Sequence, residues 1–285
     1  MTPLRQQMIT AMQLRGFSPR THQSYLGAIY DLARYTHRSP AVLTHADLQN
    51  YFTHLACERE LSGASCRLYL NAVRFLYLQV LQWPEIEVTL VVPKRAQRIP
   101  ELLTRAEVAQ IFSACQNPKH HLLLSLCYGC GLRVSEVVAI RLRHLDWERQ
   151  LLRVEQGKGA KDRAVILPPS LLAPLHQYLL RERLTDWLFP GRHSCSGTLS
   201  ITTVQKVFQR AKALSGITKI GGIHSLRHAY ATHQLECGLP IHQLQHLLGH
   251  RNIQSTLRYV HWCPSAQRNV SHYSDLLAIM AVDHG

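Results

Sequence analysis

The stretch from residue 91 to residue 100 constrains the fold most strongly. It reads Val-Val-Pro-Lys-Arg-Ala-Gln-Arg-Ile-Pro, with a proline near each end and charges of one sign between them. Proline ends helices, and a run of like charge favours an extended, solvated segment. A chain of 285 residues is long enough for two cores. The sequence therefore predicts a domain at 1–92, a basic linker at 93–100 and a second domain from 101.

Apolar residues recur at helical spacing throughout residues 1–92. Ser18-Pro19 is a typical N-cap and first-turn pair, and Thr44-x-x-Asp47 has the form of a capping box. Further helices are predicted near residues 3–14 and from Leu68 to Val80. The first domain is thus expected to be a four-helix bundle.

The second domain is predicted to be mostly helical with one small sheet. Thr104-x-x-Glu107 starts a helix, and Leu151–Glu155 and Arg163–Leu167 alternate as strands of a β-hairpin. Lys158 and Lys161 fall at the tip of this hairpin. Further helices are expected at about 170–182, 203–215, 225–237 and 241–248. The predicted fold class is mainly α.

Charge and composition favour a polyanionic partner. The net charge is +14, and residues 101–260 hold 20 basic and 10 acidic side chains. No apolar run reaches the roughly 18 residues of a membrane helix, and no secretory signal opens the chain, so a cytoplasmic protein is expected. The eight cysteines are scattered and expected to be reduced, and Cys127-x-x-Cys130 has no second pair with which to form a metal site.

Six side chains in the second domain suggest phosphodiester chemistry. They comprise two guanidiniums, an ammonium, two imidazoles and a phenol: Arg133, Lys158, His224, Arg227, His250 and Tyr259. Cleaving a phosphodiester without a metal requires cations on its oxygens, a proton donor and a nucleophile, and this set contains all three. The set has no carboxylate that could hold Mg²⁺, so neither a metal nor another cofactor is expected.

Four motifs in order resemble the tyrosine recombinase, or phage-integrase, family. They are Gly129-Cys-Gly-Leu-Arg-Val-Ser-Glu136, Gly157-Lys-Gly-Ala-Lys-Asp-Arg163, His224-Ser-Leu-Arg-His228 and the run from Leu247 to Tyr259. The chain is similar to chromosome-dimer resolvases and integron integrases. Only a short segment, 186–200, stands where the integron enzymes have a helical insertion. The resemblance implies a DNA breaking-rejoining fold with a core-binding domain at 1–92 and a catalytic domain at 101–272. The short segment in place of the insertion favours ordinary duplex sites over folded single strands.

The resemblance implies that Arg133 and Arg227 clamp the scissile phosphate and that His250 hydrogen-bonds it. Bidentate guanidinium forks suit this task better than ammonium groups do. Judged by spacing alone, Arg133 fits better as the ion-pair partner of Glu136, three residues on, and the resemblance reverses this interpretation. We interpret Glu136 as a residue that orients the arginine.

The resemblance makes Tyr259 the nucleophile, His224 the general base and Lys158 the donor of a proton to the leaving 5′-oxygen. Lys161 and Arg163 lie close enough in sequence to compete with Lys158 for that role. His228 follows Arg227 directly, about 100° around the helix, and is predicted to be structural.

The predicted function is site-specific DNA recombination through a 3′-phosphotyrosyl intermediate, on paired duplex sites held by four protomers. A relaxing topoisomerase and a catalytically silent DNA-binding regulator are the alternatives. Additional DNA contacts are expected from Lys94, Arg95, Arg98, Lys161 and Arg163. The apolar tail at 273–285 must bury its apolar side chains. The resemblance implies docking in a neighbouring protomer, and docking in its own domain is the alternative.

Overall fold

A computed structural model describes residues 2–88, 101–155, 162–191, 197–262 and 276–278. The chain divides into two compact units, Met1–Arg98 and Ile99–Gly285. Each unit has its own hydrophobic core, and the two cores share no residue. The predicted linker at 93–100 lies outside the described residues.

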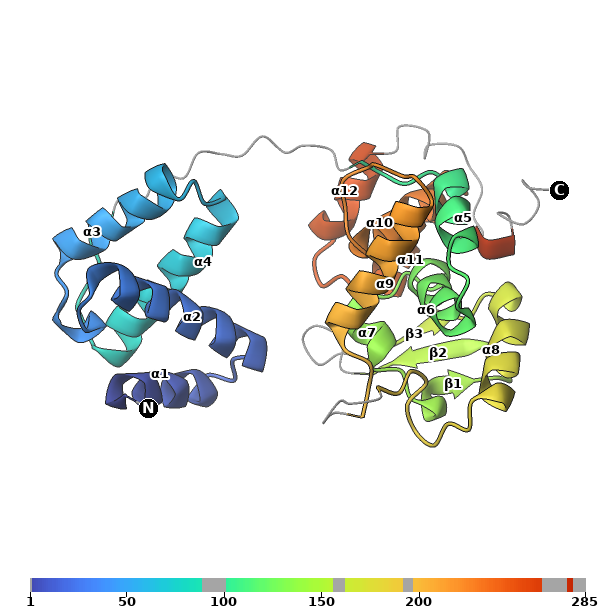
Figure 1. The fold of residues 1–285 in the computed structure, drawn as a ribbon, viewed down its shortest axis with the longest axis horizontal. Coiled ribbons are helices and arrows are strands. Elements are labelled where there is room, and N and C mark those ends of the chain that lie inside the picture. The colour runs from blue at the N-terminus through green and yellow to red at the C-terminus, as the bar shows by residue number, and fades with distance from the viewer. Residues whose placement is uncertain (1, 89–100, 156–161, 192–196, 263–275, 279–285) are drawn as a thin grey trace. The chain divides into compact units, whose positions relative to one another are not determined.

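The first unit is a bundle of helices (Figure 1). Its α-helices are α1 Pro3–Leu14, α2 Pro19–Thr36, α3 His45–Thr53 and α4 Gly63–Arg74. Each of the last two continues into a turn of π-helix, at His54–Glu58 and Phe75–Val80. The Ser18 hydroxyl accepts a hydrogen bond from the backbone N–H of Thr21, and Thr44 and Asp47 form a capping box. The predicted helical bundle is confirmed.

Eight α-helices are described in the second unit, which is mainly α as predicted. They are α5 Arg105–Ser113, α6 Pro118–Gly129, α7 Val134–Val138, α8 Pro169–Arg181, α9 Ile201–Leu214, α10 His224–Glu236, α11 Ile241–Leu248 and α12 Gln254–Trp262. Helices α6 and α10 pack against each other, and both are buried over most of their length. Helix α12 also packs on α10, which places its side chains beside those of the first α10 turns.

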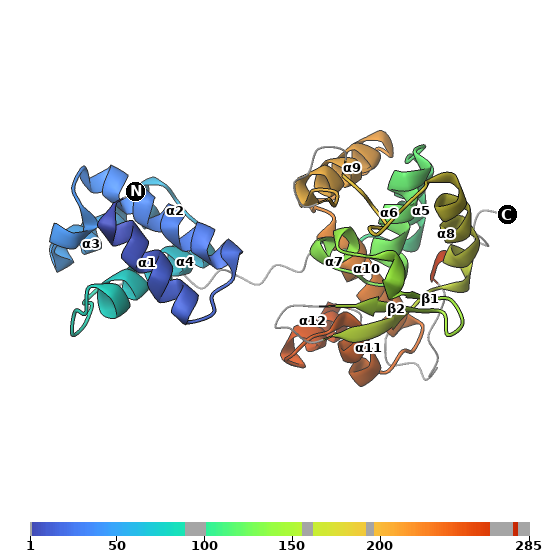
Figure 2. The same ribbon diagram turned by 90° about the horizontal axis from the view of Figure 1, so that it is seen from below.

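The sheet of the second unit has the antiparallel order β1-β2-β3, with strands Leu145–Asp146, Leu151–Val154 and Arg163–Ile166. In the predicted hairpin, Leu152 pairs with Val165 and Val154 with Arg163. The two-residue strand β1 was not predicted, because it is too short to show an alternating pattern. Helix α11 packs against β3, and Figure 2 shows α11 beside α12 on one side of β1 and β2.

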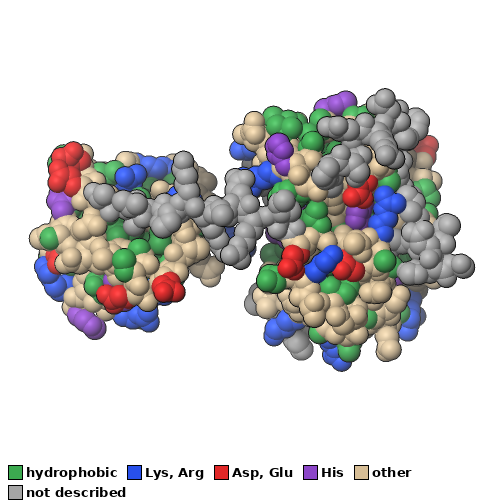
Figure 3. Space-filling view, turned by 90° about the horizontal axis from the view of Figure 1, so that it is seen from above, with side chains coloured by type: hydrophobic (Ala, Val, Ile, Leu, Met, Phe, Trp, Pro, Cys, Tyr) green, Lys and Arg blue, Asp and Glu red, His purple; other side chains and the backbone are tan. Residues whose placement is uncertain are grey.

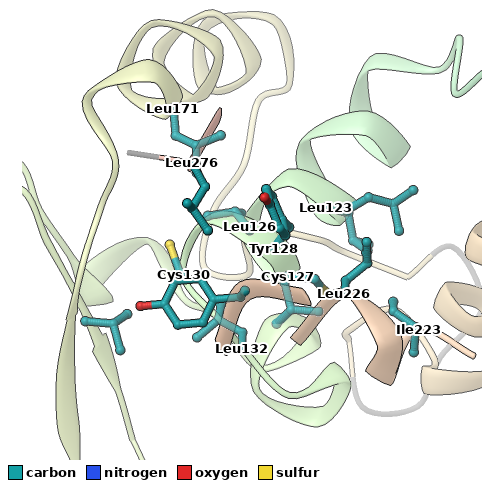
Figure 4. Close-up of a cluster of buried hydrophobic side chains, with 14 of the residues drawn as sticks. Leu123, Leu126, Cys127, Tyr128, Cys130, Leu132, Leu171, Ile223, Leu226 and Leu276 are labelled. Carbon is teal, nitrogen blue, oxygen red and sulfur yellow. The ribbon is translucent and has the colours of Figure 1, made fainter. Parts of the chain in front are cut away.

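The C-terminal tail contributes to the core of its own unit. Leu276 is 1% exposed and belongs to the same cluster as Leu171 of α8, beside which it lies in Figure 4. A methyl group at Gly129 would lie 2.9 Å from Leu277 Cδ1. In the single chain, residues 276–278 therefore dock in their own unit, which is the alternative to the neighbouring protomer that the resemblance implies. Residues 273–275 and 279–285 lie outside the described part.

The surface carries charges of both signs. On the face in Figure 3, acidic and basic side chains of the second unit lie next to one another. Exposed ion pairs of this unit include Arg153–Asp162 and Arg149–Asp146. Within the described ranges, no helix combines the length and apolar character needed to cross a membrane.

Candidate active site

Glu136 is a buried carboxylate surrounded by three guanidiniums. It accepts hydrogen bonds from the backbone N–H of Arg133 at 2.8 Å and from the Arg133 guanidinium at 2.6 Å. Arg227 Nη1 lies 3.8 Å from its Oε2. Burial by itself would raise the pKa of Glu136, but the hydrogen bonds and ion pair with Arg163 outweigh it. The Arg133 N–H and Arg227 act in the same direction as Arg163, and the pKa of Glu136 is lowered to about 2. The carboxylate is therefore ionised at neutral pH and orients the arginines, as predicted.

Arg163 is the third guanidinium, and its position contradicts the prediction that it binds DNA. Its side chain is 5% exposed, and it donates two hydrogen bonds to the Glu136 carboxylate, at 2.9 and 2.8 Å. Its Nε donates to the Leu247 carbonyl at 2.8 Å. Because side chains alternate along a strand, Arg163 shares the inward face of β3 with Val165. It links β3 to α7 and α11 and does not point into the surrounding water.

Arg227 lies behind the site and is held by backbone carbonyls. It donates hydrogen bonds to the carbonyls of Gly131 and Leu248, each at 2.6 Å. Burial and the neighbouring Arg133 lower the pKa of Arg227 to about 10, so it stays charged at neutral pH. Gly131 has φ +60°, and a Cβ there would lie 2.4 Å from the Tyr230 ring. Only glycine fits this turn, which aims the Gly131 carbonyl at Arg227.

His250 is fixed on both ring nitrogens. Arg227 Nη2 lies 3.2 Å from Nε2, and Nδ1 lies 2.9 Å from the Thr256 hydroxyl. Because a guanidinium only donates, Nε2 accepts and Nδ1 carries the proton. His250 follows Gly249, which ends α11 at φ +63° and whose Cβ would lie 2.9 Å from Arg163 Cδ. Gly249 thus positions His250 and also makes room for Arg163.

Tyr259 is 4% exposed and lies on α12, facing α10. Its hydroxyl is 3.0 Å from His228 Nδ1, and its ring stacks on His250 with centroids 6.3 Å apart. Burial raises the pKa of Tyr259, although Arg227, Arg133 and Arg258 act in the opposite direction. The phenol is therefore protonated at rest and needs a base in order to attack.

The prediction that His228 lies away from the site is wrong. It is four residues from His224, so both rings lie on one face of α10, with centroids 6.1 Å apart. His228 points about 100° away from Arg227 around α10, but α12 packs along that side of α10, so His228 still lies in the site. His224 is exposed at the start of α10, and burial of part of its ring, with Arg227 and Arg133 nearby, lowers its pKa.

The side chains described above line a pocket of about 520 Å³ that is open to solvent. Its lining is Arg133, His224, His228, Gly249, His250, Arg251, Asn252, Ser255, Arg258, Tyr259 and Trp262. Arg227 adds its charge from beneath. Three guanidiniums surround a single carboxylate, so the centre has a net positive charge and favours an anion. In the described ranges, no three His, Cys, Asp or Glu side chains are grouped as metal ligands.

Five predicted site residues lie outside the described residues: Lys94, Arg95, Arg98, Lys158 and Lys161. The other five members of the predicted catalytic set, Arg133, His224, Arg227, His250 and Tyr259, are all at or directly beneath the pocket.

Acid is expected to destabilise the second unit. Burial lowers the pKa of His228, His233 and His250 to about 4, whereas the unfolded value is near 6.5. Between these values the unfolded chain binds more protons, so the free energy of unfolding falls as pH drops from 6.5 to 4. Each unit of pKa difference corresponds to about 1.4 kcal/mol. Urea unfolding at pH 7, 5.5 and 4.5 measures this slope, which His233→Gln should reduce. A flat profile would contradict the prediction.

Two family models match the chain. The model described as "Phage integrase family" covers residues 101–265, which is more than half of the sequence. The model described as "Phage integrase, N-terminal SAM-like domain" covers residues 4–85.

Similar proteins include an integrase/recombinase of Escherichia coli. It is 32% identical over an alignment of 288 residues, which covers 86% of this chain and 85% of the relative. The tyrosine recombinase XerA of Thermococcus onnurineus is 34% identical over 254 residues, covering 88% of this chain and 87% of the relative.

Solved structures share the fold. A lambda integrase dimer bound to a core site matches with a TM-score of 0.72 at 20% identity, covering 88% of this chain and 95% of the other. The XerH recombinase bound to its difH substrate before cleavage also matches with a TM-score of 0.72, at 18% identity. This match covers 91% of this chain and 82% of the other.

Proposed function

Because the chain belongs to the phage integrase family of tyrosine recombinases, we propose that it cleaves and rejoins duplex DNA at specific sites through a 3′-phosphotyrosyl intermediate. Membership of this family supports site-specific DNA recombination as the activity. One observation carries the proposal: Arg133, His224, His250 and Tyr259 line a single pocket above Arg227.

The two arginines bind the scissile phosphate. Arg133 is partly exposed, at 19%, and lines the pocket, whereas Arg227 is held rigidly by two carbonyls. Guanidiniums fixed in this way stabilise the charge that develops on the non-bridging oxygens without having to reorganise. His224 supplies a further hydrogen-bonding group at the pocket wall, and His250, held by Arg227 and Thr256, stacks its ring on Tyr259.

Tyr259 attacks the phosphorus, and the 5′-oxygen leaves as a hydroxyl with a proton from Lys158. Val154 pairs with Arg163 at the base of the hairpin, and Arg163 is one of the three guanidiniums around Glu136. The loop that carries Lys158 therefore begins and ends beside this guanidinium cluster. Lys94, Arg95, Arg98 and Lys161 add contacts to the DNA backbone. The phosphotyrosyl bond conserves the energy of the phosphodiester, so religation needs neither ATP nor a metal.

Strand exchange takes place between paired sites held by four protomers. The lambda integrase dimer, which shares this fold, is bound to a core site, and this supports assembly on DNA for this chain. Sizing of DNA complexes by light scattering distinguishes a single protomer on a half-site from a synaptic tetramer.

The proposal is tested by trapping the covalent intermediate. The protein is incubated in EDTA with nicked duplexes that have a randomised centre, and adducts that survive denaturation are sequenced. A 5′ label on the cut strand should remain with the protein, because the bond is to the 3′-phosphate. The released fragment should accept phosphate from polynucleotide kinase, because its 5′ end is a hydroxyl.

Three outcomes would contradict the proposal. Adducts that require added Mg²⁺ or Zn²⁺ would exclude the metal-free mechanism. Relaxation of supercoiled plasmid without any site preference would indicate the topoisomerase. DNA binding with no adduct at any sequence would indicate the silent regulator.

A further inference from the structure

His228 is the hydrogen-bonding partner of the Tyr259 hydroxyl. Its Nδ1 lies 3.0 Å from the phenol oxygen, and the two ring centroids are 5.7 Å apart. Trp262 packs edge-on against both rings, at 5.9 Å from His228 and 5.3 Å from Tyr259. The pair is therefore held from α10 and α12 at once, with the indole limiting the movement of either ring.

The direction of this hydrogen bond follows from the two ionisation states. Burial, with His224 and Arg227 nearby, lowers the pKa of His228 to about 4, so the ring is neutral at pH 7. Burial raises the pKa of Tyr259, so its O–H is intact. If Nδ1 carried the imidazole proton, it could not accept a hydrogen bond. The O–H of the buried phenol would then lose this acceptor, which is costly. The phenol therefore donates and His228 Nδ1 accepts.

We propose that His228 is a catalytic residue that takes the proton from Tyr259 during cleavage and returns it during religation. The inference rests on the proposed function, in which Tyr259 is the nucleophile. In cleavage the Tyr259 O–H bond breaks, its proton moves to His228 Nδ1, and the phenol oxygen bonds to phosphorus while the bond to the 5′-oxygen breaks. In religation the 5′-hydroxyl attacks and returns its proton to Lys158, and the departing phenolate recovers its proton from His228.

The other two imidazoles of the pocket suit different tasks. The nitrogens of His250 are already engaged by Arg227 and Thr256, so it has no lone pair free for a phenol proton. His224 is exposed at the start of α10, where it can reach the oxygens of a phosphate lying on Arg133. Transfer to His228 requires no rearrangement of the resting site, because the acceptor already lies at hydrogen-bonding distance.

Single-turnover cleavage by His228→Ala, His228→Asn and His224→Ala separates the roles. The substrates are the selected nicked duplex and the same site with a p-nitrophenyl phosphate ester at the cleavage point, whose leaving group needs no acid. His228→Ala should cleave both about 10²- to 10⁴-fold more slowly, the range for loss of a general base. His228→Asn can still accept a hydrogen bond from Tyr259 but is not basic, so it should be equally slow. Added imidazole should partly restore His228→Ala.

Full activity of His228→Asn would reduce His228 to a positioning residue and overturn the proposal. Faster cleavage by His228→Ala would show instead that the hydrogen bond restrains Tyr259. If wild-type protein forms no adduct, the proposed function has failed, and the hydrogen bond is then tested without DNA. In ¹⁵N-histidine spectra at pH 7, the Nδ1 of His228 should be unprotonated and should shift in Tyr259→Phe. A protonated Nδ1 would exclude it as the acceptor.

Discussion

Tyr259→Phe is expected to abolish the covalent DNA adduct while leaving DNA binding nearly unchanged. The substitution removes the oxygen that becomes bonded to phosphorus and keeps the ring that stacks on His250. It leaves His228 Nδ1 without this donor, at a cost to stability of about 1 kcal/mol. Denaturing gels with the nicked duplex measure the adduct, and gel shifts measure the binding.

Tyr128→Phe is the matched control for this variant. The Tyr128 hydroxyl likewise contacts a histidine Nδ1, that of His233, at 2.9 Å, but Tyr128 does not line the pocket. The control loses the same kind of hydrogen bond and should retain the adduct. An adduct that persists in Tyr259→Phe would move the nucleophile elsewhere, and Tyr273 would be tested next.

Glu136→Gln should cost about 3–5 kcal/mol of unfolding free energy, the range for breaking a buried ion pair. The side chain is 5% exposed and balances Arg163 and Arg227, which are 5% and 4% exposed. Without the carboxylate, buried guanidiniums repel one another. Adduct formation should also fall, because Arg133 loses the oxygens that orient it. Urea unfolding and single-turnover cleavage measure the two effects.

Glu107→Gln provides the comparison within the same unit. Glu107 pairs with Lys219 at 2.6 Å, but the two side chains are 23% and 31% exposed. Solvent screening limits such a pair to at most about 1 kcal/mol. If the two variants lose similar amounts of stability, the guanidinium cluster does not depend on Glu136 as described.

The elements and most of the site could be predicted because their signals are local. Capping at Ser18, Thr44 and Thr104 fixes helix starts in the sequence itself, and the hairpin alternation at 151–167 is short and regular. Arg133, Arg227, His250 and Tyr259 follow motifs whose order and spacing are visible without coordinates.

The roles of Arg163 and His228 depend on contacts between distant segments. Arg163 meets Glu136 across 27 positions, and His228 meets Tyr259 across 31. Helical or strand periodicity gives the face that a residue occupies but not the element opposite that face. For Arg163, inward alternation with Val165 was a usable signal. For His228, no local pattern indicated that α12 would bring a phenol to its ring.

The separate cores imply that heating this protein will not give one melting temperature. The cluster containing Tyr51 and the cluster containing Tyr128 share no side chain, so each can lose its cooperative order on its own. Calorimetry of the whole chain should then resolve into two endotherms, and a substitution at Glu136 should move only one of them. A single midpoint taken from the total helix content would average the two transitions and understate the loss of stability in the second unit.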